Sequence, residues 1–382
     1  MINVAIIGTG AICDSHIEAY RRFPKRCRIV AMVDIHIEKA QAKIDNNGLD
    51  AVALADYHEL CTMKELDMVS ICLPPSEHAK VAVDFLHAGK HVLCEKPLAP
   101  TLEECDAMIA AAKEGNCNLS TVAQNRFKPD VVKVKKLVDS GLLGTKHFAQ
   151  ASSLWWRGEN YYNLWWRGRW ESEGGGCTLI HGIHHIDLFL WLMGKPAEIT
   201  ALVCNRAHTN SEVEDISIST VRFADGAMGN VIASILHHGE EQRLILDAQN
   251  GSVEIPFALH ANNQLENGFP YDNEEMLQKM QAFCDAVEIP YFGHAGQIDD
   301  VLNAIETGGQ PLVTGEDGRL AIEFISATYQ SAFTGKTVKL PMTPADLFYT
   351  KKGILANAVR FFNKTTSVDN FQNDKIQVGG TL

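Results

Sequence analysis

The chain has 382 residues, of which 46% are apolar and 21% charged, and its formal net charge is −13. This length exceeds the roughly 250–300 residues at which a single core stops growing, so at least two domains are expected. The negative charge disfavours nucleic acids and anionic lipid surfaces, and no apolar run reaches the roughly 18 residues of a membrane span. The opening MINVAIIGTG lacks the features of a signal peptide, and ten cysteines without a CxxC pair indicate free thiols. We therefore expect a cytoplasmic protein.

The first 125 residues alternate between patterns typical of strands and of helices. Thr101 and Glu104 form the capping-box pattern that starts one of these helices. Repeated β-α-β units predict a doubly wound parallel sheet, the Rossmann type of α/β fold. Strands are expected at 2–8, 28–34, 53–54, 67–73, 91–94 and 119–123, and helices at 11–23, 38–46, 79–88 and 101–114.

The pattern then changes to longer strand-like runs, with the hairpin sequence Ala224-Asp225-Gly226 between two of them. It predicts a C-terminal α+β domain with a large, mostly antiparallel open sheet. Strands are expected at 146–154, 197–205, 216–223, 228–236 and 243–247, and helices at 129–140, 178–193, 274–287, 297–307 and 315–333. We expect domains at 1–124 and 125–345, and a partly mobile C-terminal extension at 346–382, with a polar tail after Asn363.

A glycine-rich turn follows the first strand and opens a helix, which is the context of a dinucleotide fingerprint. Gly8 would allow the tight turn and Gly10 the approach of a pyrophosphate, while Cys13 replaces the usual third glycine. Asp34 ends the second strand, where a carboxylate accepts ribose hydroxyls and repels a 2′-phosphate. The sequence therefore predicts a dinucleotide site and favours NAD over NADP.

Three segments are similar to a known family: IIGTGAIC, ICLPPSEHAKVAVDFLHAGKHVLCEKPLA and EGGGCTLIHGIHHIDLFLWLMG. Over residues 1–340 the chain resembles the glucose–fructose oxidoreductase / inositol dehydrogenase / rhizopine-catabolism (Gfo/Idh/MocA) family. The resemblance implies an NAD(P)-dependent dehydrogenase that moves hydride between nicotinamide and a sugar, polyol or inositol-like substrate. It also implies a homodimer or homotetramer joined through the C-terminal sheet.

The resemblance assigns catalytic roles to Lys96 and His184, which would handle the proton of the reacting hydroxyl. Many relatives carry an aspartate one helical turn before the histidine, but here Ile180 stands there and His181 is the polar neighbour. Three alternatives stay open: His184 acts alone as the base, His181 assists it, or another group is the base.

Further site residues follow from the resemblance and from their positions at strand ends. Expected cofactor contacts are Gly8, Gly10, Ala11, Ile12, Asp34, Pro74, Ser76, His78, Glu95, Lys96 and Asn125. Expected substrate contacts are Lys96, Arg126, Trp155, Trp166, His181 and His184, with His294 a weaker candidate.

Residues 154–170, LWWRGENYYNLWWRGRW, hold five of the six tryptophans. Rings and arginines of this kind can wall a sugar pocket, but they are equally typical of a core or a subunit interface. The nearby histidines raise the question of a metal site, since His181 and His185 are four residues apart. No glutamate lies between them and no third ligand is evident, so no metal is expected.

Two other functional classes are weighed against the dehydrogenase. A glycosidase that acts by transient oxidation would keep NAD tightly bound and show no net NADH. A non-catalytic NAD-binding sensor or scaffold would bind NAD without turning over any polyol, and Lys96 and His184 speak against it.

Overall fold

The computed structural model describes residues 1–369. Its N-terminal part is built on a six-stranded sheet in the order β3-β2-β1-β4-β5-β6, with all neighbours parallel. This is the strand order of a dinucleotide-binding Rossmann fold, which confirms the predicted doubly wound sheet. The strands are β1 (Ile2–Ile7), β2 (Cys27–Val33), β3 (Val52–Leu54), β4 (Met68–Ile71), β5 (His91–Cys94) and β6 (Leu119–Thr121).

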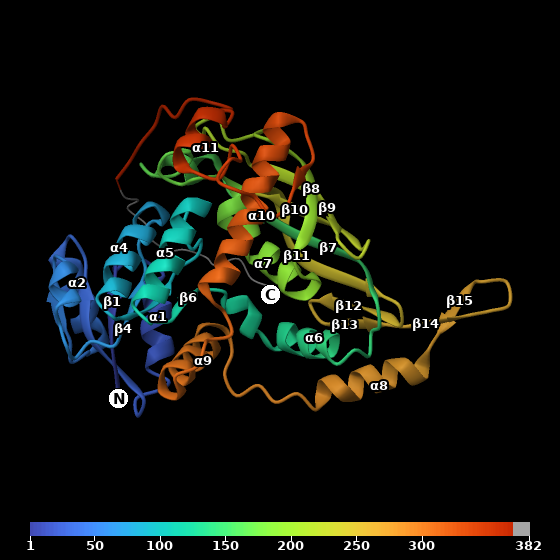
Figure 1. Ribbon diagram of the computed structural model, residues 1–382, viewed down its shortest axis with the longest axis horizontal. Coiled ribbons are helices and arrows are strands. Elements are labelled where there is room, and N and C mark those ends of the chain that lie inside the picture. Colours follow the sequence, from blue (N-terminus) through green and yellow to red (C-terminus); the bar gives the residue numbers. More distant parts are fainter. Residues whose placement is uncertain (370–382) are drawn as a thin grey trace.

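Helices cover this sheet, and local sequence explains where they start and end (Figure 1). The Thr101 hydroxyl accepts a hydrogen bond from the Glu104 amide, which caps α5 as predicted. One helix starts at Pro75, four residues earlier than expected, because proline is well tolerated in the first helical turn. The helices are α1 (Cys13–Tyr20), α2 (Ile37–Asn47), α3 (His58–Cys61), α4 (Pro75–His87) and α5 (Leu102–Glu114).

The second domain contains an eight-stranded open sheet in the order β13-β12-β11-β7-β10-β9-β8-β16. Only β7 and β10 pair in parallel among these neighbours, so the sheet is mostly antiparallel, as predicted. Sequence analysis missed β12, β13, β16 and the hairpin of β14 and β15. The strands are β7 (Lys146–Trp156), β8 (Pro196–Cys204), β9 (Ile216–Phe223), β10 (Met228–Ser234), β11 (Leu236–Ala248), β12 (Gly251–Ile255), β13 (Ala258–His260), β14 (Asn262–Gln264), β15 (Pro270–Asp272) and β16 (Val338–Lys339).

The helix expected at 178–193 is divided, because η3 (Thr178–Gly182) is a π-helical turn and α7 (Ile183–Met193) follows it. Such turns are rare and are frequent at functional sites. Phe189 of α7 packs its ring against Phe324 of α10, so both helices share the core beside the sheet. The other helical elements are η1 (Gln124–Phe127), α6 (Pro129–Asp139), η2 (Glu159–Asn163), α8 (Glu274–Asp285), α9 (Gly293–Thr307), α10 (Gly315–Thr334) and α11 (Lys351–Asn357).

Helix α9 lies between elements of the second domain in sequence but packs on the first domain, beside α1 (Figure 1). Its Ile298, Val301 and Leu302 are buried in the same apolar cluster as residues of β1, β2 and α1. The Gln297 side chain accepts a hydrogen bond from the Ala123 amide at 2.9 Å and donates to a β6 carbonyl. The chain therefore crosses between the domains more than once.

The C-terminal extension returns to the aromatic segment. Val368 forms a parallel bridge with Leu164, and its carbonyl accepts a hydrogen bond from the Trp165 amide at 3.0 Å. The tail expected to be mobile after Asn363 is thus packed up to this point, and its residues 370–382 lie outside the described ones. Within residues 1–369, no helix is both long and apolar enough to cross a membrane, and all ten cysteines are free thiols.

Candidate active site

The turn after β1 has the geometry of a dinucleotide site. Gly8 has φ = 96°, and a Cβ placed there would lie 2.6 Å from the Cys72 carbonyl oxygen, so only glycine fits. At Gly10 an added Cβ would meet no atom within 4 Å. In the described structure, the amides of Gly10, Ala11 and Ile12 form no hydrogen bond. Free amides, open space and the N-terminus of α1 together fit a pyrophosphate.

Asp34 directly follows β2 and is half-buried, as expected for a residue that binds the adenosine ribose. Its Oδ2 accepts hydrogen bonds from the Thr9 amide and hydroxyl at 3.2 and 2.6 Å, and its Oδ1 accepts one from the His36 amide at 3.0 Å. Because two carboxylate oxygens offer about four acceptor positions, ribose hydroxyls can still be accepted. Thr9 was not predicted, and it fixes the carboxylate beside the glycine turn.

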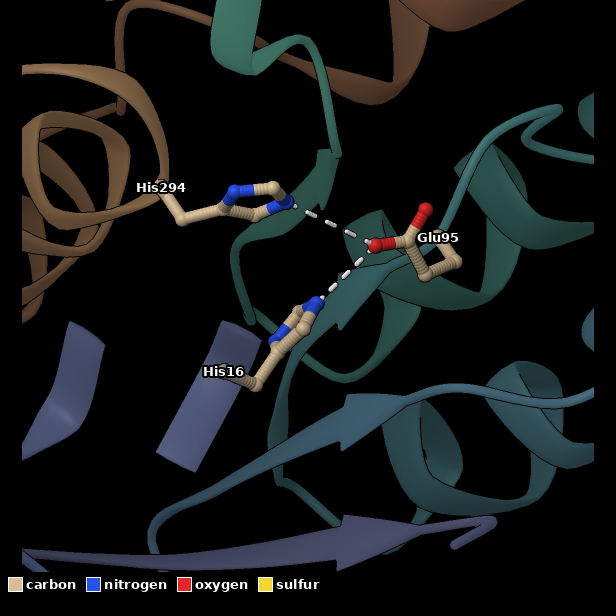
Figure 2. Close-up of side chains that lie close together, drawn as sticks. All are labelled: His16, Glu95 and His294. Carbon is tan, nitrogen blue, oxygen red and sulfur yellow. Dashed lines mark hydrogen bonds and ion pairs between the residues drawn. The ribbon is translucent and has the colours of Figure 1, made fainter. Parts of the chain in front are cut away.

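Glu95 follows β5 and lies in a buried network (Figure 2). His16 of α1 donates to its Oε1 at 3.0 Å, and the amide of Lys96 donates to its Oε2 at 3.1 Å. The other His16 nitrogen lies 3.3 Å from the Ser70 hydroxyl, which contacts Tyr20. Burial tends to raise the pKa of Glu95, but the hydrogen bond and charge of His16 bring it down to about 2. The carboxylate is therefore ionised and ties α1 to the turn that carries Lys96.

Two expected cofactor contacts, Glu95 and His78, have protein partners instead. Glu95 is 5% exposed and both of its oxygens have protein partners, so it supports the turn from beneath. His78 is fully buried, with its ring nitrogens 2.8 Å from the carbonyl oxygens of Leu73 and Pro97. It joins the turn after β4 to the turn after β5, and we withdraw it as a cofactor contact. Pro74 and Ser76 are half-buried beside it and stay predictions.

His294 belongs to the same group, since its Nε2 lies 4.0 Å from Glu95 Oε1 (Figure 2). Ligand atoms of His16, Glu95 and His294 are all within 4.8 Å of one another, which is close enough for a metal ion. His16 and Glu95 nevertheless bond directly to each other, whereas His294 Nε2 is buried without a hydrogen-bond partner in the described structure. His294 was considered as a substrate contact, but the structure places it beside Glu95 and His16.

Lys96 and His184 line one small cavity, together with Asn125. The Lys96 Nζ donates to the Ile180 carbonyl at 3.1 Å, one helical turn before His184. Burial lowers the pKa of Lys96, and burial followed by the charge of Lys96 lowers that of His184 well below its ordinary value. His184 is therefore neutral near pH 7, and within residues 1–369 it forms no hydrogen bond. A neutral imidazole beside an ammonium group can take a proton from a hydroxyl held between them.

His181 lies in the π-helical turn, and its Nδ1 is buried without a hydrogen-bond partner in the described structure. The rings of Trp155 and Tyr161 lie 6.1 and 5.6 Å from its ring. Burial, then the charges of nearby cations, lowers the pKa of His181 well below its ordinary value. A neutral, unpaired ring nitrogen at the edge of an aromatic wall is suited to a substrate hydroxyl.

Arg126 is a correction to the predicted substrate contacts. Its guanidinium is 3% exposed and makes two hydrogen bonds with Asp187, at 2.8 and 2.7 Å. It also bonds to Asp317 at 3.1 Å and lies over the Trp191 ring. With these partners Arg126 joins η1 to α7 and α10 and has no surface for a substrate. Asp187 is likewise occupied, so it is no ligand for a metal at the neighbouring histidines.

The aromatic segment divides between pocket and core. Trp155 and Tyr161 face His181, and Trp166 stacks on Arg167. Trp170 instead is 2% exposed and packs edge-on against Tyr329, so it belongs to the core. The core alternative thus holds for Trp170, while the substrate contacts expected of Trp155 and Trp166 stay predictions. Tyr161 and Arg167 lay in that segment but could not be singled out, because no pattern shows which rings turn inward.

A glycine-turn dinucleotide site, with a lysine just after β5 that shares a cavity with a histidine from the second domain, defines a nicotinamide-dependent oxidoreductase. Residues 2–123 match the oxidoreductase family with an NAD-binding Rossmann fold, and residues 131–254 match the Gfo/Idh/MocA C-terminal domain. The chain belongs to the Gfo/Idh/MocA family, as its sequence motifs predicted.

Relatives over nearly the whole chain include sugar and inositol enzymes. Inositol 2-dehydrogenase of Salmonella typhimurium is 25% identical over 351 residues, covering 90% of this chain and 98% of its own. D-glucoside 3-dehydrogenase of Escherichia coli is 26% identical, covering 89% and 97%. The WlbA dehydrogenase of Chromobacterium violaceum, solved with NADH and UDP-GlcNAcA, has a TM-score of 0.77 and 25% identity, covering 90% and 96%.

Proposed function

We propose that the protein oxidises a secondary hydroxyl of a sugar, polyol or inositol-like molecule with NAD, or reduces the corresponding ketone. The observation that carries this proposal is the shared cavity of Lys96 and His184 at the sheet edge where the dinucleotide turn lies. The dehydrogenases named above are relatives over about nine-tenths of the chain and support the substrate class.

When bound, the nicotinamide would exchange hydride with the substrate carbon. His184 accepts the hydroxyl proton because its imidazole is neutral and has no other hydrogen-bond partner in the described structure. Lys96 donates one hydrogen bond to the Ile180 carbonyl, which leaves two N–H groups to orient the hydroxyl and stabilise alkoxide character. His181 stands one helical turn away and orients the substrate.

NAD is favoured over NADP because Asp34 places a carboxyl group at the ribose position, and Thr9 holds it in place. A 2′-phosphate would bring two more negative charges against it, with no arginine at that position of the sequence. Titration of both cofactors tests this point, and tighter binding of NADP would contradict it.

The main experiment screens polyols and sugars with NAD and NADP and follows NADH absorbance. For the best substrate, Lys96→Ala and His184→Ala are each expected to lower kcat by about 10²–10⁴-fold. His87→Ala is the matched control, because His87 is half exposed at the end of α4 and, among residues 1–369, pairs only with Glu114. Circular dichroism and NAD titration check that each variant folds and binds cofactor.

The same experiment separates the rival functions. Full activity of either variant would remove that residue from the mechanism. Co-purified NAD without net NADH formation would favour the glycosidase, and NAD binding without any turnover would favour the sensor or scaffold. We further propose a cytoplasmic location, in keeping with the free thiols of all ten cysteines.

We also propose that the outer face of the large sheet pairs with a second copy. Leu202 of β8 is 74% exposed and lies directly opposite Ile218 of β9, which is 44% exposed. Ile232 of β10 continues the row, as the partner of Ile218 on its other side. A row of apolar side chains across three strands, two of them exposed and Ile232 half-buried, is typical of an interaction surface.

A further inference from the structure

Arg167 has an unusual position at the wall of the substrate site. Its guanidinium carbon lies 4.1 Å from the centre of the Tyr161 ring and 4.3 Å from that of Trp166. Among residues 1–369, the side-chain hydrogen bonds of Arg167 all come from Nη1, which donates to the Tyr161 hydroxyl and to Glu173 at 3.2 Å. In the described part of the chain, Nε and Nη2 have no partner, and the side chain is 19% exposed. Three of its five N–H groups are therefore free.

The charge of Arg167 is only partly balanced by the protein. Glu173 is fully buried and is its single carboxylate partner among the ion pairs of residues 1–369. Burial raises the pKa of Glu173 to about 7, so near neutral pH this group carries only part of a negative charge. The Glu173 carboxyl group also accepts a hydrogen bond from the Gly168 amide, at 2.6 Å, on the oxygen that Arg167 does not use. A guanidinium with free donors and an incomplete counter-charge is an anion-binding group.

The surrounding charges point the same way. After burial, the charges that most lower the pKa of His181 come from Arg157, Lys96 and Arg167. Arg157 is paired with Glu240 at 3.0 Å, but Lys96 forms no ion pair among the described residues, its hydrogen bond going to a carbonyl. Arg157 and Arg167 thus face Glu240 and the incompletely ionised Glu173, while the charge that acts most on Lys96 is that of Glu95 on the other side of the turn.

Tyr161 also links Arg167 to the reaction site. Its ring lies between the Arg167 guanidinium and the His181 imidazole, with centres 4.1 and 5.6 Å away. The guanidinium covers one face of Tyr161 and one of Trp166, and these are the surfaces on which a neutral sugar ring would otherwise stack. In their place, the Arg167 guanidinium presents its free N–H donors to a substrate.

We propose that the substrate is a sugar acid, whose carboxylate is bound by the free Nε and Nη2 of Arg167 while Lys96 and His184 act on one of its hydroxyls. This inference rests on the proposed dehydrogenase function and narrows its substrate class. A carboxylate is planar and matches the two parallel donors of this edge of a guanidinium. Tyr161 and Trp166 hold the guanidinium in place, so the side chain loses little conformational entropy when a carboxylate binds.

The test compares matched substrates on the full-length protein with NAD: D-glucose against D-glucuronate, and D-galactose against D-galacturonate. Hydrogen bonds to a charged group predict a kcat/KM for the acid at least about tenfold higher than for its neutral partner. Arg167→Gln is expected to bring this ratio near one, mainly through KM, and Arg167→Lys to restore part of it. Arg222→Gln, at an exposed position of β9, is the control and should keep the wild-type ratio.

Loss of a buried partner could unfold the Arg167 variant, so Arg167→Gln/Glu173→Gln, which removes both charges, is made in parallel. A ratio at or below one in the wild type would overturn the inference and leave the dehydrogenase intact. A ratio that survives in Arg167→Gln and in the double variant would also overturn it. Higher kcat/KM for D-glucose 6-phosphate than for D-glucuronate would contradict a carboxylate ligand.

If none of these molecules is oxidised, the inference is tested by ligand binding, measured as a shift of the melting temperature. The NAD-loaded protein should melt at a higher temperature with D-glucuronate than with equal D-glucose, and this difference should disappear in Arg167→Gln. Such a result would support the anion site while counting against the proposed reaction, so the two failures are distinguishable. Equal melting temperatures with both sugars would overturn the inference.

Discussion

The two sides of Lys96 differ in how completely the protein bonds its own polar groups. Behind the lysine, Glu95, His16 and His78 are buried among protein partners: Glu95 and His16 use both of their polar side-chain atoms, His78 donates to a carbonyl, and His294 Nε2 lacks a partner in the described structure. In front of it, His181 Nδ1 is buried without a partner in the described structure, and its pKa is lowered by burial and in part by the charge of Lys96. Since buried polar groups are nearly always hydrogen-bonded, unpaired ones need an explanation.

The contrast teaches which part of the site the chain completes by itself. The side behind Lys96 fixes its backbone before any ligand binds, whereas the front side leaves donors and acceptors for one. Preorganised support beneath a reactive group, facing an unsaturated pocket, is the arrangement that catalysis needs. The two sides should therefore respond differently to mutation.

The largest contrast is expected between two glycines of the same turn. Gly8→Ala should cost about 3 kcal/mol or more of stability, because φ is 96° and the new Cβ would clash with the Cys72 carbonyl. Gly10→Ala meets no atom of the protein, so its melting temperature should stay near wild type. Its methyl would instead enter the pyrophosphate space and weaken NAD by about 100-fold, or about 2.7 kcal/mol. Calorimetry and NAD titration measure both; unchanged NAD affinity in Gly10→Ala would contradict the assigned cofactor position.

Glu95→Gln tests the supporting side. Breaking the buried pair with His16 should lower the free energy of unfolding by about 3 kcal/mol and reduce kcat. The pKa of Glu95 is depressed to about 2, so its contribution is present above about pH 4.5 and is lost as the pH falls toward 2. Urea unfolding at pH 7 and at pH 3 should therefore show a smaller difference between variant and wild type at pH 3. A Glu95→Gln protein with wild-type stability would show that the pair of Glu95 and His16 does not contribute to the free energy of unfolding.

His185→Leu tests a buried residue of α7 whose two ring nitrogens have no partner in the described structure. Burial, and then the charge of Lys128, lowers the pKa of His185 to about 3, against about 6.5 when unfolded. Keeping His185 buried and neutral thus costs more stability as the pH falls from about 6.5 toward 3, because the unfolded chain takes up the proton first. The variant should be more stable than wild type by about 1 kcal/mol at pH 7, and by more at pH 5. A destabilised variant in urea unfolding would mean that the imidazole has a role that leucine cannot fill.

The smallest effect on catalysis is expected at the outer sheet face, far from either side of Lys96. Leu202→Glu should lower the oligomeric state in light scattering, because it places a charge among exposed apolar side chains. Its kcat should change by less than about twofold, as for most surface substitutions. An unchanged mass, or a monomeric wild type, would exclude this face as the subunit contact.

Much of the architecture could be predicted because it depends on local pattern. Buried parallel strands read as continuous apolar runs, and Gly8, Asp34 and Lys96 follow such runs at the sheet edge where ligands bind. His184 was placed through the family resemblance, and the structure brings it to the cavity of Lys96. The short strands β12 to β16 were missed, since two to five residues give little periodicity.

The corrections have a different cause: they depend on partners distant in the sequence. Arg126 reads as a free arginine at a strand end until Asp187, 61 residues away, is seen to hold it. Glu95 depends on His16, 79 residues earlier, and His78 on the carbonyl of Pro97. A residue's type and position suggest what it can do, but only the fold shows whether another group already uses it.

The return of α9 to the first domain has a consequence for dissecting the protein. A fragment cut at residue 124 would lose Ile298, Val301 and Leu302, and would leave the apolar surface of α1 and the β-strands beneath it in water. The Ala123 amide would lose Gln297 at the same cut. Expression of the nucleotide-binding half alone should therefore give aggregated material, and a soluble version would require α9 to be spliced directly onto its end.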